Sequence, residues 1–393
     1  MEENFDMYAK TLYGFEDLLA KELSLLGAQN ISKGNRGVAF RGDKGFMYKA
    51  NLSLRTAIKI LKPIHKASVS DPDALYQMCY DFPWEDYMEV TTTFAIDSIV
   101  FGDLFVHSQY VSQKAKDGLV DRFRDKVGER PNVKLNKPDL QINIHIEQDQ
   151  CTLSLDSSGA SLHQRGYRTA TNIAPLNEVL AAGIILLSGW EGNTDFLDPM
   201  CGSGTLVIEA AMIAAKIPAN INRKSFAFEN WKDWDPDLFE TIRSAQLEKV
   251  VNPAIKIMGY DKAPSAVEKS LQNVQNANLQ AFVIISKNNF FHSEKTTQGP
   301  LHLLTNPPYG ERLEGDINAI YQSMGDTLKQ SYPNTHAWMI TANMEAMKFV
   351  GLRPSRKIKI FNGKLESRLL YFPIYEGSKR THKYIDSKEK EEE

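Results

Sequence analysis

Between residues 176 and 341 the chain alternates short apolar stretches with longer helix-like segments, and this alternation restricts its fold more than any other feature. The short stretches, which we expect to be strands, lie near residues 194–197, 255–260, 282–285, 301–304 and 335–341. Strands that alternate with helices in this way form a parallel, doubly wound sheet. We therefore expect an α/β domain over residues 161–376.

The C-terminal end of this expected domain departs from the alternation. Residues 357–361 and 368–374 have the character of two strands around Asn362-Gly363, the preferred sequence of a two-residue hairpin turn. The sheet should therefore end in an antiparallel strand, which is not expected of a dehydrogenase. Residues 377–393 are polar and charged, and we expect them to be disordered.

A glycine-rich turn follows the first expected strand. Asp198 ends the strand, and Gly202 and Gly204 come just before an alanine-rich helix. Glycine can adopt positive φ and lets a ligand approach the backbone, while the helix N-terminus offers free N–H groups. The turn lacks the third glycine of a dinucleotide fingerprint and the Gly-Lys-Ser/Thr end of a phosphate loop. It therefore predicts a different nucleotide-like ligand at the carboxyl end of the strands.

The side chains of this turn suggest how such a ligand is held. Asp198 can accept a hydrogen bond from an ammonium group. Asp261, at the end of the second strand, can accept hydrogen bonds from both hydroxyls of a ribose. A role as a helix cap before Pro264 is an equal alternative for Asp261. The expected cofactor-binding residues of the turn are Asp198, Cys201, Gly202, Ser203, Gly204 and Thr205.

The tetrapeptide Asn306-Pro307-Pro308-Tyr309 follows the fourth expected strand. Its prolines have no N–H to donate and fix their φ angles, so the loop presents carbonyl oxygens in a stiff geometry. The side chain of Asn306 and the carbonyl of Pro307 can accept hydrogen bonds from the two N–H groups of an exocyclic amine on a nucleobase. Tyr309 can stack on that base. A proline-rich turn with a capping asparagine is the structural alternative.

These motifs resemble the THUMP-domain RNA methyltransferases, and in particular the bacterial large-subunit (23S) ribosomal RNA guanine-N2 methyltransferases. The resemblance includes residues 162–168, 174–178 and 306–313 and reaches about residue 375. It implies a ferredoxin-like region at residues 1–60, a THUMP RNA-binding domain at 61–160 and a Rossmann-like methyltransferase domain at 161–376. Some members carry a second methyltransferase domain at the carboxyl end, which we do not expect here.

The resemblance also implies a cofactor and a reaction. The cofactor is S-adenosylmethionine, and Asn289 and Phe290 stand where many relatives have an acid near its adenine ring. The reaction is methylation of guanine N2 in ribosomal RNA without a metal, with Asn306, Pro307, Pro308 and Tyr309 holding the base. Transfer RNA guanine-N2 and adenine-N6 in RNA or DNA stay open, because the loop suits each of these amines. A catalytically silent RNA-binding assembly factor is the non-enzymatic alternative.

Charge is unevenly distributed along a chain whose formal net charge is only −3. Residues 33–66 contain nine Lys and Arg and a single acid, Asp43, which gives a local charge of +8. Such a patch can contact phosphates, although a solvated surface is the alternative. The residues expected to bind RNA are Arg36, Arg41, Lys44, Lys114 on a helix at Ser108–Val127, and Arg165 and Arg168 at the domain junction.

Cysteine content and hydropathy indicate the compartment. The three cysteines, Cys79, Cys151 and Cys201, are scattered and form neither a disulfide framework nor a zinc pair. The sequence has no signal peptide and no apolar run long enough to span a membrane. We therefore expect a cytoplasmic protein that does not contact membranes.

Overall fold

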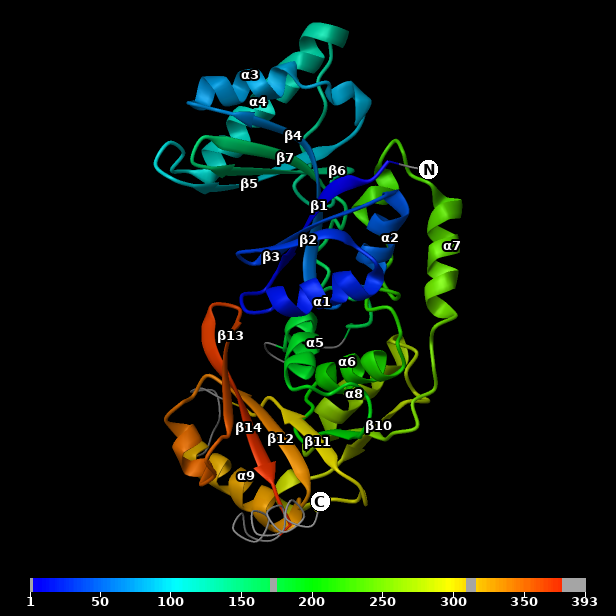
Figure 1. Ribbon diagram of the computed structural model, residues 1–393, viewed down its shortest axis with the longest axis vertical. Coiled ribbons are helices and arrows are strands. Elements are labelled where there is room, and N and C mark those ends of the chain that lie inside the picture. Colours follow the sequence, from blue (N-terminus) through cyan, green and yellow to red (C-terminus); the bar gives the residue numbers. More distant parts are fainter. Residues whose placement is uncertain (1–2, 170–174, 309–315, 377–393) are drawn as a thin grey trace, which may run out of the picture. The chain divides into compact units, whose positions relative to one another are not determined.

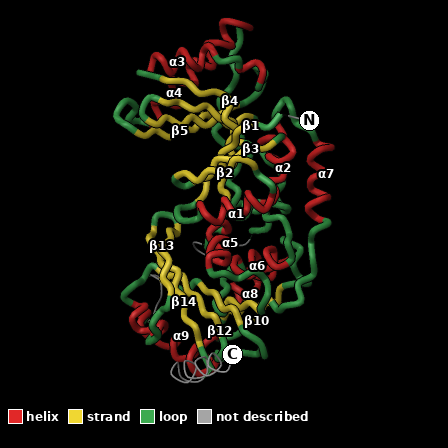
Figure 2. Tube along the Cα trace, in the orientation of Figure 1, coloured by secondary structure: helices red, strands yellow, loops and turns green. Residues whose placement is uncertain are grey.

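The computed structural model describes residues 3–169, 175–308 and 316–376. The chain forms two compact units, each built from two segments. Unit 1 comprises Met1–Gln164 and Arg223–Gln246, and unit 2 comprises Arg165–Asn222 and Leu247–Glu393. Figure 1 labels their elements, and Figure 2 distinguishes helices from strands.

Unit 1 contains one seven-stranded sheet in the order β2-β3-β1-β4-β7-β6-β5. Its strands are β1 (Phe5–Thr11), β2 (Gln29–Gly34), β3 (Gly37–Gly42), β4 (Ala57–Ser68), β5 (Phe94–Phe101), β6 (Leu140–Glu147) and β7 (Gln150–Asp156). Its helices are α1 (Glu16–Leu26), α2 (Lys44–Ser53), α3 (Pro72–Asp81), α4 (Ser108–Val127) and α7 (Pro236–Leu247), with 3₁₀ turns η1 (Trp84–Asp86) and η2 (Ala227–Asn230). The long strand β4 pairs with both β1 and β7, so one sheet runs through the ranges 1–60 and 61–160.

Alternating side chains give this sheet one apolar face. Ala9 of β1 and Ile144 of β6 lie in the same buried core as Leu19 of α1 and Leu119 of α4. Phe228, from the second segment of unit 1, joins that core. The segment Arg223–Gln246 therefore packs as part of unit 1, although it lies between the two segments of unit 2 in the sequence.

Unit 2 contains a second seven-stranded sheet, in the order β10-β9-β8-β11-β12-β14-β13. Its strands are β8 (Asp195–Asp198), β9 (Ile257–Asp261), β10 (Val283–Lys287), β11 (Leu301–Thr305), β12 (Thr335–Thr341), β13 (Arg356–Asn362) and β14 (Leu365–Ile374). Strands β8 to β12 are parallel, and β14 is antiparallel to both β12 and β13. The expected Rossmann-like sheet with an antiparallel last strand is confirmed.

Helices lie on both sides of this sheet, with α9 on one side and α5, α6 and α8 on the other (Figure 1). These helices are α5 (Glu178–Leu187), α6 (Thr205–Ala214), α8 (Pro264–Asn276) and α9 (Ile317–Ser331), with 3₁₀ turns η3 (Phe290–His292) and η4 (Ala346–Val350). Alternate residues of the strands, such as Leu197 and Leu303, pack with Tyr321 of α9 in a buried core. Among the described residues, no helix has both the length and the apolar character needed to cross a membrane.

The C-terminal hairpin differs by one residue from its expected turn. Asn362 pairs with Leu365, so the two loop residues are Gly363 and Lys364. Gly363 has a φ of 62°, which a glycine adopts without strain. Positive φ at the first loop position is typical of a type II′ turn, whereas Asn-Gly predicts type I′ with Asn362 inside the loop.

Candidate cofactor and base site

Three expected site segments meet at one edge of the sheet in unit 2. Strand β8 lies between β9 and β11 and is parallel to both, with Asp198 beside Gly259 and Leu197 beside Leu303. This register places Asp198, Asp261 and Asn306 at or just beyond the carboxyl ends of adjacent strands. Open α/β sheets bind their ligands at this edge.

Asp198 is a buried acid with few partners. It is 2% exposed, and its Oδ1 accepts a hydrogen bond from the backbone N–H of Met200 at 3.1 Å. Burial raises the pKa of Asp198 to about 7, and the nearby charge of Asp261 adds to that effect. A bound ammonium group would favour the ionised carboxylate and reverse the shift. Asp198 is therefore suited to hold a cationic ligand.

Asp261 fixes the glycine turn to the end of β9. Its Oδ2 accepts a hydrogen bond from the N–H of Gly202 at 3.0 Å, and its Oδ1 accepts one from Ala263 at 2.9 Å. Each carboxylate oxygen can accept a further hydrogen bond. The local, cap-like role is thus present, and binding of ribose hydroxyls by the same carboxylate stays a prediction.

The turn needs glycine at Gly204 for two reasons. Gly204 has a φ of 83°, in the left-handed region that side chains disfavour. A Cβ atom there would also lie 3.0 Å from Oγ of Ser270. The backbone of the turn is therefore packed directly against α8.

Two polar residues of α8 hold this turn, and the sequence reasoning missed them. Ser270 donates a hydrogen bond to the carbonyl of Gly202 at 2.9 Å, and Asn273 donates one to the carbonyl of Ser203 at 3.0 Å. Both side chains lie on the buried face of α8, next to Ala266. The available signal was a serine and an asparagine at core positions of an amphipathic helix, where buried polar groups need a partner.

Cys201 is a packing residue within the turn. It is buried, its N–H donates to the carbonyl of Tyr260 at 2.8 Å, and burial raises the pKa of its thiol far above the ordinary value. A Cβ atom on Gly259 would lie 3.2 Å from its Sγ, so glycine at that position makes room for the thiol. Ser203 and Thr205 are buried as well, so contacts from this turn to a cofactor would come mainly from its backbone.

Asn306 carries an acceptor that lacks a partner. Its Oδ1 is buried, and among the described residues no group donates a hydrogen bond to it. Pro307 is buried and Pro308 is half-buried. Because an unpaired buried acceptor is costly, this oxygen is suited to a donor supplied by a ligand. Tyr309 lies outside the described residues, so its expected stacking on a base stays a prediction.

The two residues expected near the adenine ring have different environments. Oδ1 of Asn289 accepts a hydrogen bond from the N–H of Phe291 at 3.2 Å and so caps η3. Phe290 is buried in the core, and its ring lies 5.3 Å from that of Tyr332. A contact of Phe290 with a cofactor is therefore available to its backbone and not to its ring.

Arg165 is fully buried, which revises the expectation that it contacts RNA. Its side chain is 0% exposed and pairs with Glu209 of α6 at 3.4 Å and with Asn220 at 3.1 Å. Tyr167 donates a hydrogen bond to the same Glu209 at 3.0 Å. The expectation rested on the positive charge of Arg165, but a buried guanidinium that is already paired cannot reach a phosphate without rearrangement.

Arg168 has a similar environment. It pairs with Glu178 of α5 at 3.0 Å and donates a hydrogen bond to Oγ1 of Thr205, the first residue of α6, at 2.9 Å. Burial raises the pKa of Glu178 to about 7. Arg168 therefore joins the beginnings of α5 and α6, and this position favours a structural role over a contact with RNA.

The expected RNA-binding residues of unit 1 differ in how they are engaged. Arg36 is exposed, whereas Arg41 pairs with Asp6 at 3.2 Å and Lys44 donates to the carbonyl of Asp233 at 3.1 Å. Lys114 on α4 pairs with Asp73 at 2.8 Å. Other basic residues of α4 also have acidic partners: Lys116, Arg122, Arg124 and Lys126.

Comparison with known protein families agrees with this architecture. Residues 165–370 match the model described as the RMKL-like methyltransferase domain, residues 69–156 match the THUMP domain, and residues 6–61 match the RlmL ferredoxin-like domain. The ribosomal RNA large subunit methyltransferase K/L of Syntrophotalea carbinolica is 37% identical over 96% of this chain and 54% of its own length. The chain therefore spans about half the length of that relative.

Solved structures show the same fold over nearly the whole chain. The crystal structure of SMU.472 complexed with SAH has a TM-score of 0.84 and 30% identity, and covers 96% of this chain and 100% of that one. A predicted N6-adenine-specific DNA methylase from Listeria monocytogenes has a TM-score of 0.83 and 27% identity, and covers 96% of this chain and 97% of that one. The chain has the glycine turn and the Asn-Pro-Pro loop, and the family model matches more than half of its length. It therefore belongs to the RMKL-like methyltransferases, and its methyltransferase domain follows an RlmL-type ferredoxin-like domain and a THUMP domain.

Proposed function

We propose that this chain is an S-adenosylmethionine-dependent RNA methyltransferase that forms N2-methylguanosine in large-subunit ribosomal RNA. The observation that carries the proposal is the buried, unpartnered Oδ1 of Asn306 among the described residues, at the edge of the sheet that also holds Asp198. A methyltransferase of this kind needs an acceptor for the target amine beside a site for a cationic cofactor. Asn306 and Asp198 meet those two needs.

The residues of unit 2 fit S-adenosylmethionine. Asp198 would accept a hydrogen bond from its ammonium group, Asp261 would accept hydrogen bonds from its ribose, and Asn289 would contact its adenine. The relative SMU.472, which shares this fold, is complexed with SAH, the product of methyl donation. When bound, the cofactor supplies an electrophilic methyl group to the target amine.

The Asn-Pro-Pro loop would activate the amine by position. Oδ1 of Asn306 and the carbonyl of Pro307 would accept hydrogen bonds from its two N–H groups. These bonds would turn the nitrogen lone pair towards the methyl group. Such alignment lowers the barrier by fixing the geometry of the reacting atoms. Tyr309 would stack on the base after it leaves the RNA helix, as flipped bases stack in other base-modifying enzymes. A strong general base is not required, because the amine can lose its proton after transfer.

The choice of guanine in ribosomal RNA rests on the relatives. The protein from Syntrophotalea carbinolica is named as a large-subunit ribosomal RNA methyltransferase, and the THUMP domain favours RNA over DNA. Adenine-N6 stays the second candidate, because the structure from Listeria monocytogenes is described as an adenine-specific DNA methylase. Guanine-N2 in transfer RNA is a third possibility that the loop chemistry permits.

Methylated-nucleoside mass spectrometry tests the proposal. The purified chain and S-adenosylmethionine are incubated with ribosomal RNA, transfer RNA and DNA from a strain that lacks the gene, and the hydrolysed nucleosides are quantified. We expect N2-methylguanosine from large-subunit ribosomal RNA. N6-methyladenosine, or product from transfer RNA alone, would replace this proposal with one of the alternatives.

Asn306→Ala gives the first specific prediction. The variant should bind S-adenosylmethionine normally but transfer methyl about 100-fold more slowly, the scale of one lost transition-state hydrogen bond. Asn252→Ala, which removes an exposed amide of the same unit, is the matched control and should retain full turnover. Turnover of Asn306→Ala near that of the control would show that Asn306 does not hold the amine. Tyr309→Ala should behave like Asn306→Ala.

A further inference from the structure

The sheet of unit 1 has a second face that is built differently from its core face. Cross-strand register places Lys66 of β4, Thr152 of β7, His145 of β6 and Ile99 of β5 in one row. On the far side of β4, Tyr8 of β1 lies beside Leu61. We call this surface the open face and define it by Tyr8, Lys10, Arg41, Lys66, Asn143 and His145, which line one cavity. On β1 and β6 the neighbours of these residues lie in the buried core: Met7, Ala9, Ile142, Ile144 and Ile146.

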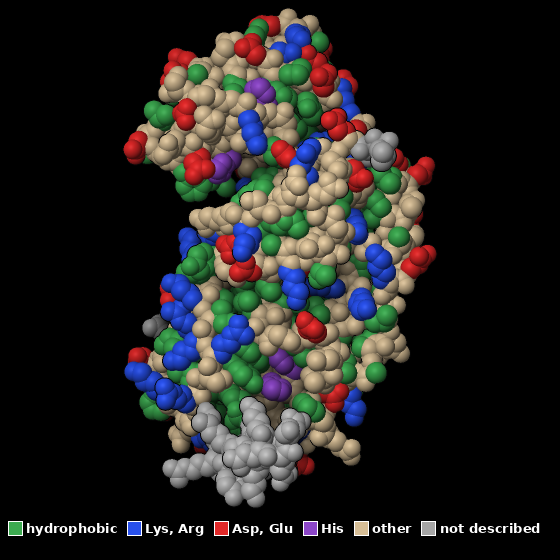
Figure 3. Space-filling view, viewed as in Figure 1, with side chains coloured by type: hydrophobic (Ala, Val, Ile, Leu, Met, Phe, Trp, Pro, Cys, Tyr) green, Lys and Arg blue, Asp and Glu red, His purple; other side chains and the backbone are tan. Residues whose placement is uncertain are grey.

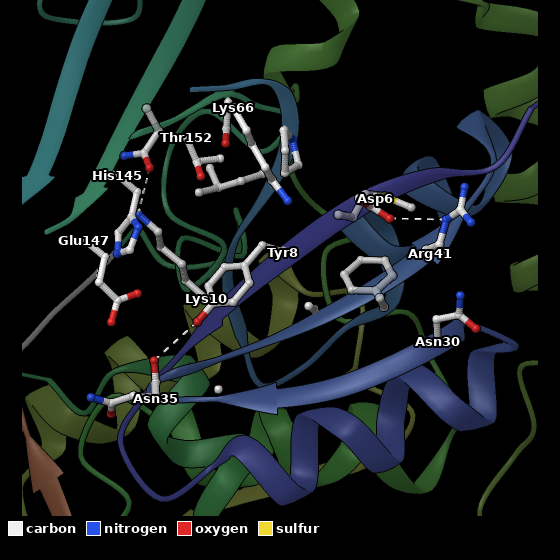
Figure 4. Close-up of a pocket in the computed structure, with 18 of the residues that line it drawn as sticks. Asp6, Tyr8, Lys10, Asn30, Asn35, Arg41, Lys66, His145, Glu147 and Thr152 are labelled. Carbon is white, nitrogen blue, oxygen red and sulfur yellow. Dashed lines mark hydrogen bonds and ion pairs between the residues drawn. The ribbon is translucent and has the colours of Figure 1, made fainter. Parts of the chain in front are cut away.

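The open face is hollowed into a cavity of about 660 Å³. The space-filling view shows the hollow between the β2–β3 end of the sheet and strands β5 and β6 (Figure 3). Figure 4 shows Tyr8, Lys10, Lys66 and His145 around it, contributed by β1, β4 and β6. Sites for small ligands and nucleotides have volumes in this range, roughly 300–1,000 Å³.

Tyr8 is held in place as a platform in this cavity. A Cβ atom on Gly37 would lie 2.4 Å from Cζ of Tyr8, so the ring occupies the space that a side chain of β3 would fill. The hydroxyl of Tyr8 donates a hydrogen bond to the carbonyl of Asn35 at 3.3 Å. The sheet therefore fixes both the position and the tilt of the ring before any ligand binds.

A pair of aromatic rings, His145 and Phe101, lies on the same face as Tyr8. The rings of His145 and Phe101 have their centroids 5.6 Å apart, and Phe101 is 56% exposed. Burial lowers the pKa of His145, which favours a neutral imidazole near pH 7. Aromatic rings exposed on an open sheet stack unpaired bases and so contribute to binding without regard to base identity.

The charges on this face suit a short, flexible strand better than a duplex backbone. Nζ of Lys10 donates a hydrogen bond to Oδ1 of Asn143 at 3.3 Å, and burial lowers the pKa of Lys10. Asp156 and Asp97 favour the charged form of Lys10, but the carboxylate of Asp156 already pairs with Lys59, and the charge of Lys59 opposes them. Lys10 would therefore gain from a phosphate.

The acids on the rim limit how many phosphates the face can hold. Glu147 is an exposed lining residue, and the exposed Asp6 already pairs with Arg41. The lining therefore offers three Lys and Arg side chains, Lys10, Arg41 and Lys66, but no continuous track of positive charge.

We propose that the open face of unit 1 binds about two unpaired ribonucleotides of the RNA, with bases stacked on Tyr8 and on the His145–Phe101 pair and a phosphate at Lys10. This inference rests on the proposed function and adds where single-stranded RNA beside the target would be held. Base edges and faces are accessible in single strands, whereas A-form duplex hides its base faces within the stack. The amide of Asn143 at the floor of the cavity would contact a base edge.

The test measures binding of a fluorescent, unstructured RNA of roughly eight nucleotides to the full-length chain, a length within the usual site sizes for single strands. We expect Tyr8→Ala and His145→Ala to weaken binding roughly tenfold each. Tyr76→Ala is the matched control, because Tyr76 is a partly exposed ring on α3, outside the open face. The control should bind as tightly as the wild type. A duplex of the same sequence should compete poorly for the labelled strand.

A second measurement does not depend on how the variants fold. Photocrosslinking of the wild-type chain to the same RNA carrying 4-thiouridine should label peptides from β1, β5 and β6. Equal affinities of the two open-face variants and the control, preference for duplex RNA, absence of RNA binding, or crosslinks confined to α4 would each overturn the inference. Failure of the proposed function is distinguishable, because it appears as absence of methylated nucleoside with the wild-type chain and leaves these affinities measurable.

Discussion

At the scale of single residues, the chemistry of unit 2 depends on one buried acid. Burial raises the pKa of Asp198 to about 7, so near neutral pH the free chain contains both the protonated and the ionised form. Only the ionised form can pair with an ammonium group. Proton binding and cofactor binding should therefore compete at this site.

The competition gives a pH prediction with a definite sign. Affinity for S-adenosylmethionine should fall about tenfold for each pH unit below 7, because each unit protonates Asp198 further. Calorimetry between pH 5 and 7.5 measures this, a range in which the ammonium group of the cofactor keeps most of its charge. In Asp198→Asn the affinity should be low and independent of pH over this range. A wild-type affinity that does not change below pH 7 would refute the role of Asp198.

The same pKa shift affects the stability of the free chain. The pKa of Asp198 in the folded chain is raised above its ordinary value of 3.8, so the folded chain holds this proton more tightly than the unfolded chain does. The contribution of Asp198 to stability is therefore present below pH 4 and is lost as the pH rises through about 7. A bound ammonium group should restore that stability, so the cofactor should raise the melting temperature more at pH 8 than at pH 6.

Sequence motifs predicted the residues of this site better than they predicted the surroundings. Asp198, Gly204 and Asn306 follow strands, and parallel strands bring their carboxyl ends to one edge of the sheet. Arg165 could not be assigned in this way, because its burial depends on Glu209, 44 residues away in the sequence. A basic residue in a sequence shows its charge but not its partner.

At the scale of elements, helix α6 is held at two points by arginine side chains, through one hydrogen bond and one buried ion pair. Arg168 binds its first residue, Thr205, and Arg165 binds Glu209 one turn later. The glycine turn leads directly into this helix, with Gly204 as its N-cap. The Arg165 and Arg168 interactions therefore fix the backbone that would contact the cofactor.

Breaking the Arg165–Glu209 ion pair should destabilise the chain strongly. Arg165→Met leaves Glu209 buried without its cation, and such changes typically cost about 3–5 kcal/mol of unfolding free energy. The double variant Arg165→Met, Glu209→Met removes both charges and should recover much of that loss. Urea denaturation of the wild type and the two variants measures the difference. A single variant as stable as the double variant would show that the pair contributes little.

The basic residues of the β2–β3 region and those of helix α4 should affect RNA binding differently. Replacing Arg36, Arg41 and Lys44 with glutamate should lower the salt dependence of RNA binding by nearly one unit of slope for each lost phosphate contact. The matched control replaces Lys116, Arg124 and Lys126 of α4 with glutamate. All three pair with acids, whereas in the first set Arg36 is exposed and Lys44 donates to a carbonyl. The control should change the slope less, and affinity titrations over a range of salt concentrations compare the two. Equal changes would show that the ion pairs of α4 open readily to phosphates.

Element boundaries could be predicted where periodicity was strong, and less well where local chemistry decides. Helix α4 has its expected bounds, Ser108–Val127, because a long amphipathic pattern ends at Gly128. The hairpin between β13 and β14 is shifted by one residue, because Asn362 is paired in the ladder and Gly363 alone has positive φ. The roles of Ser270 and Asn273 escaped prediction, since their partners are backbone carbonyls in the glycine turn.

At the scale of the whole molecule, the sequence order of the domains differs from their packing. The chain enters unit 2 at Arg165, returns to unit 1 for Arg223–Gln246, and then completes unit 2. The sequence of Arg223–Gln246 carries no local signal for the core that this segment joins. Phe226, Phe228 and Trp231 are buried in the core that contains Tyr48 of α2, whose ring lies 4.5 Å from that of Phe228. Such long-range packing cannot be read from periodicity.

This arrangement predicts how the chain tolerates truncation. Deleting residues 1–164 removes the core around Phe226, Phe228 and Trp231, and the exposed aromatic patch should make the remaining chain aggregate. Replacing Arg223–Gln246 with a flexible Gly/Ser linker in the same truncated chain removes that patch and should restore a monodisperse protein. Size-exclusion chromatography with light scattering compares the two forms, and calorimetry then shows whether the second still binds S-adenosylmethionine. If the truncated chain is monodisperse with the aromatic segment in place, that segment does not depend on unit 1 for its burial.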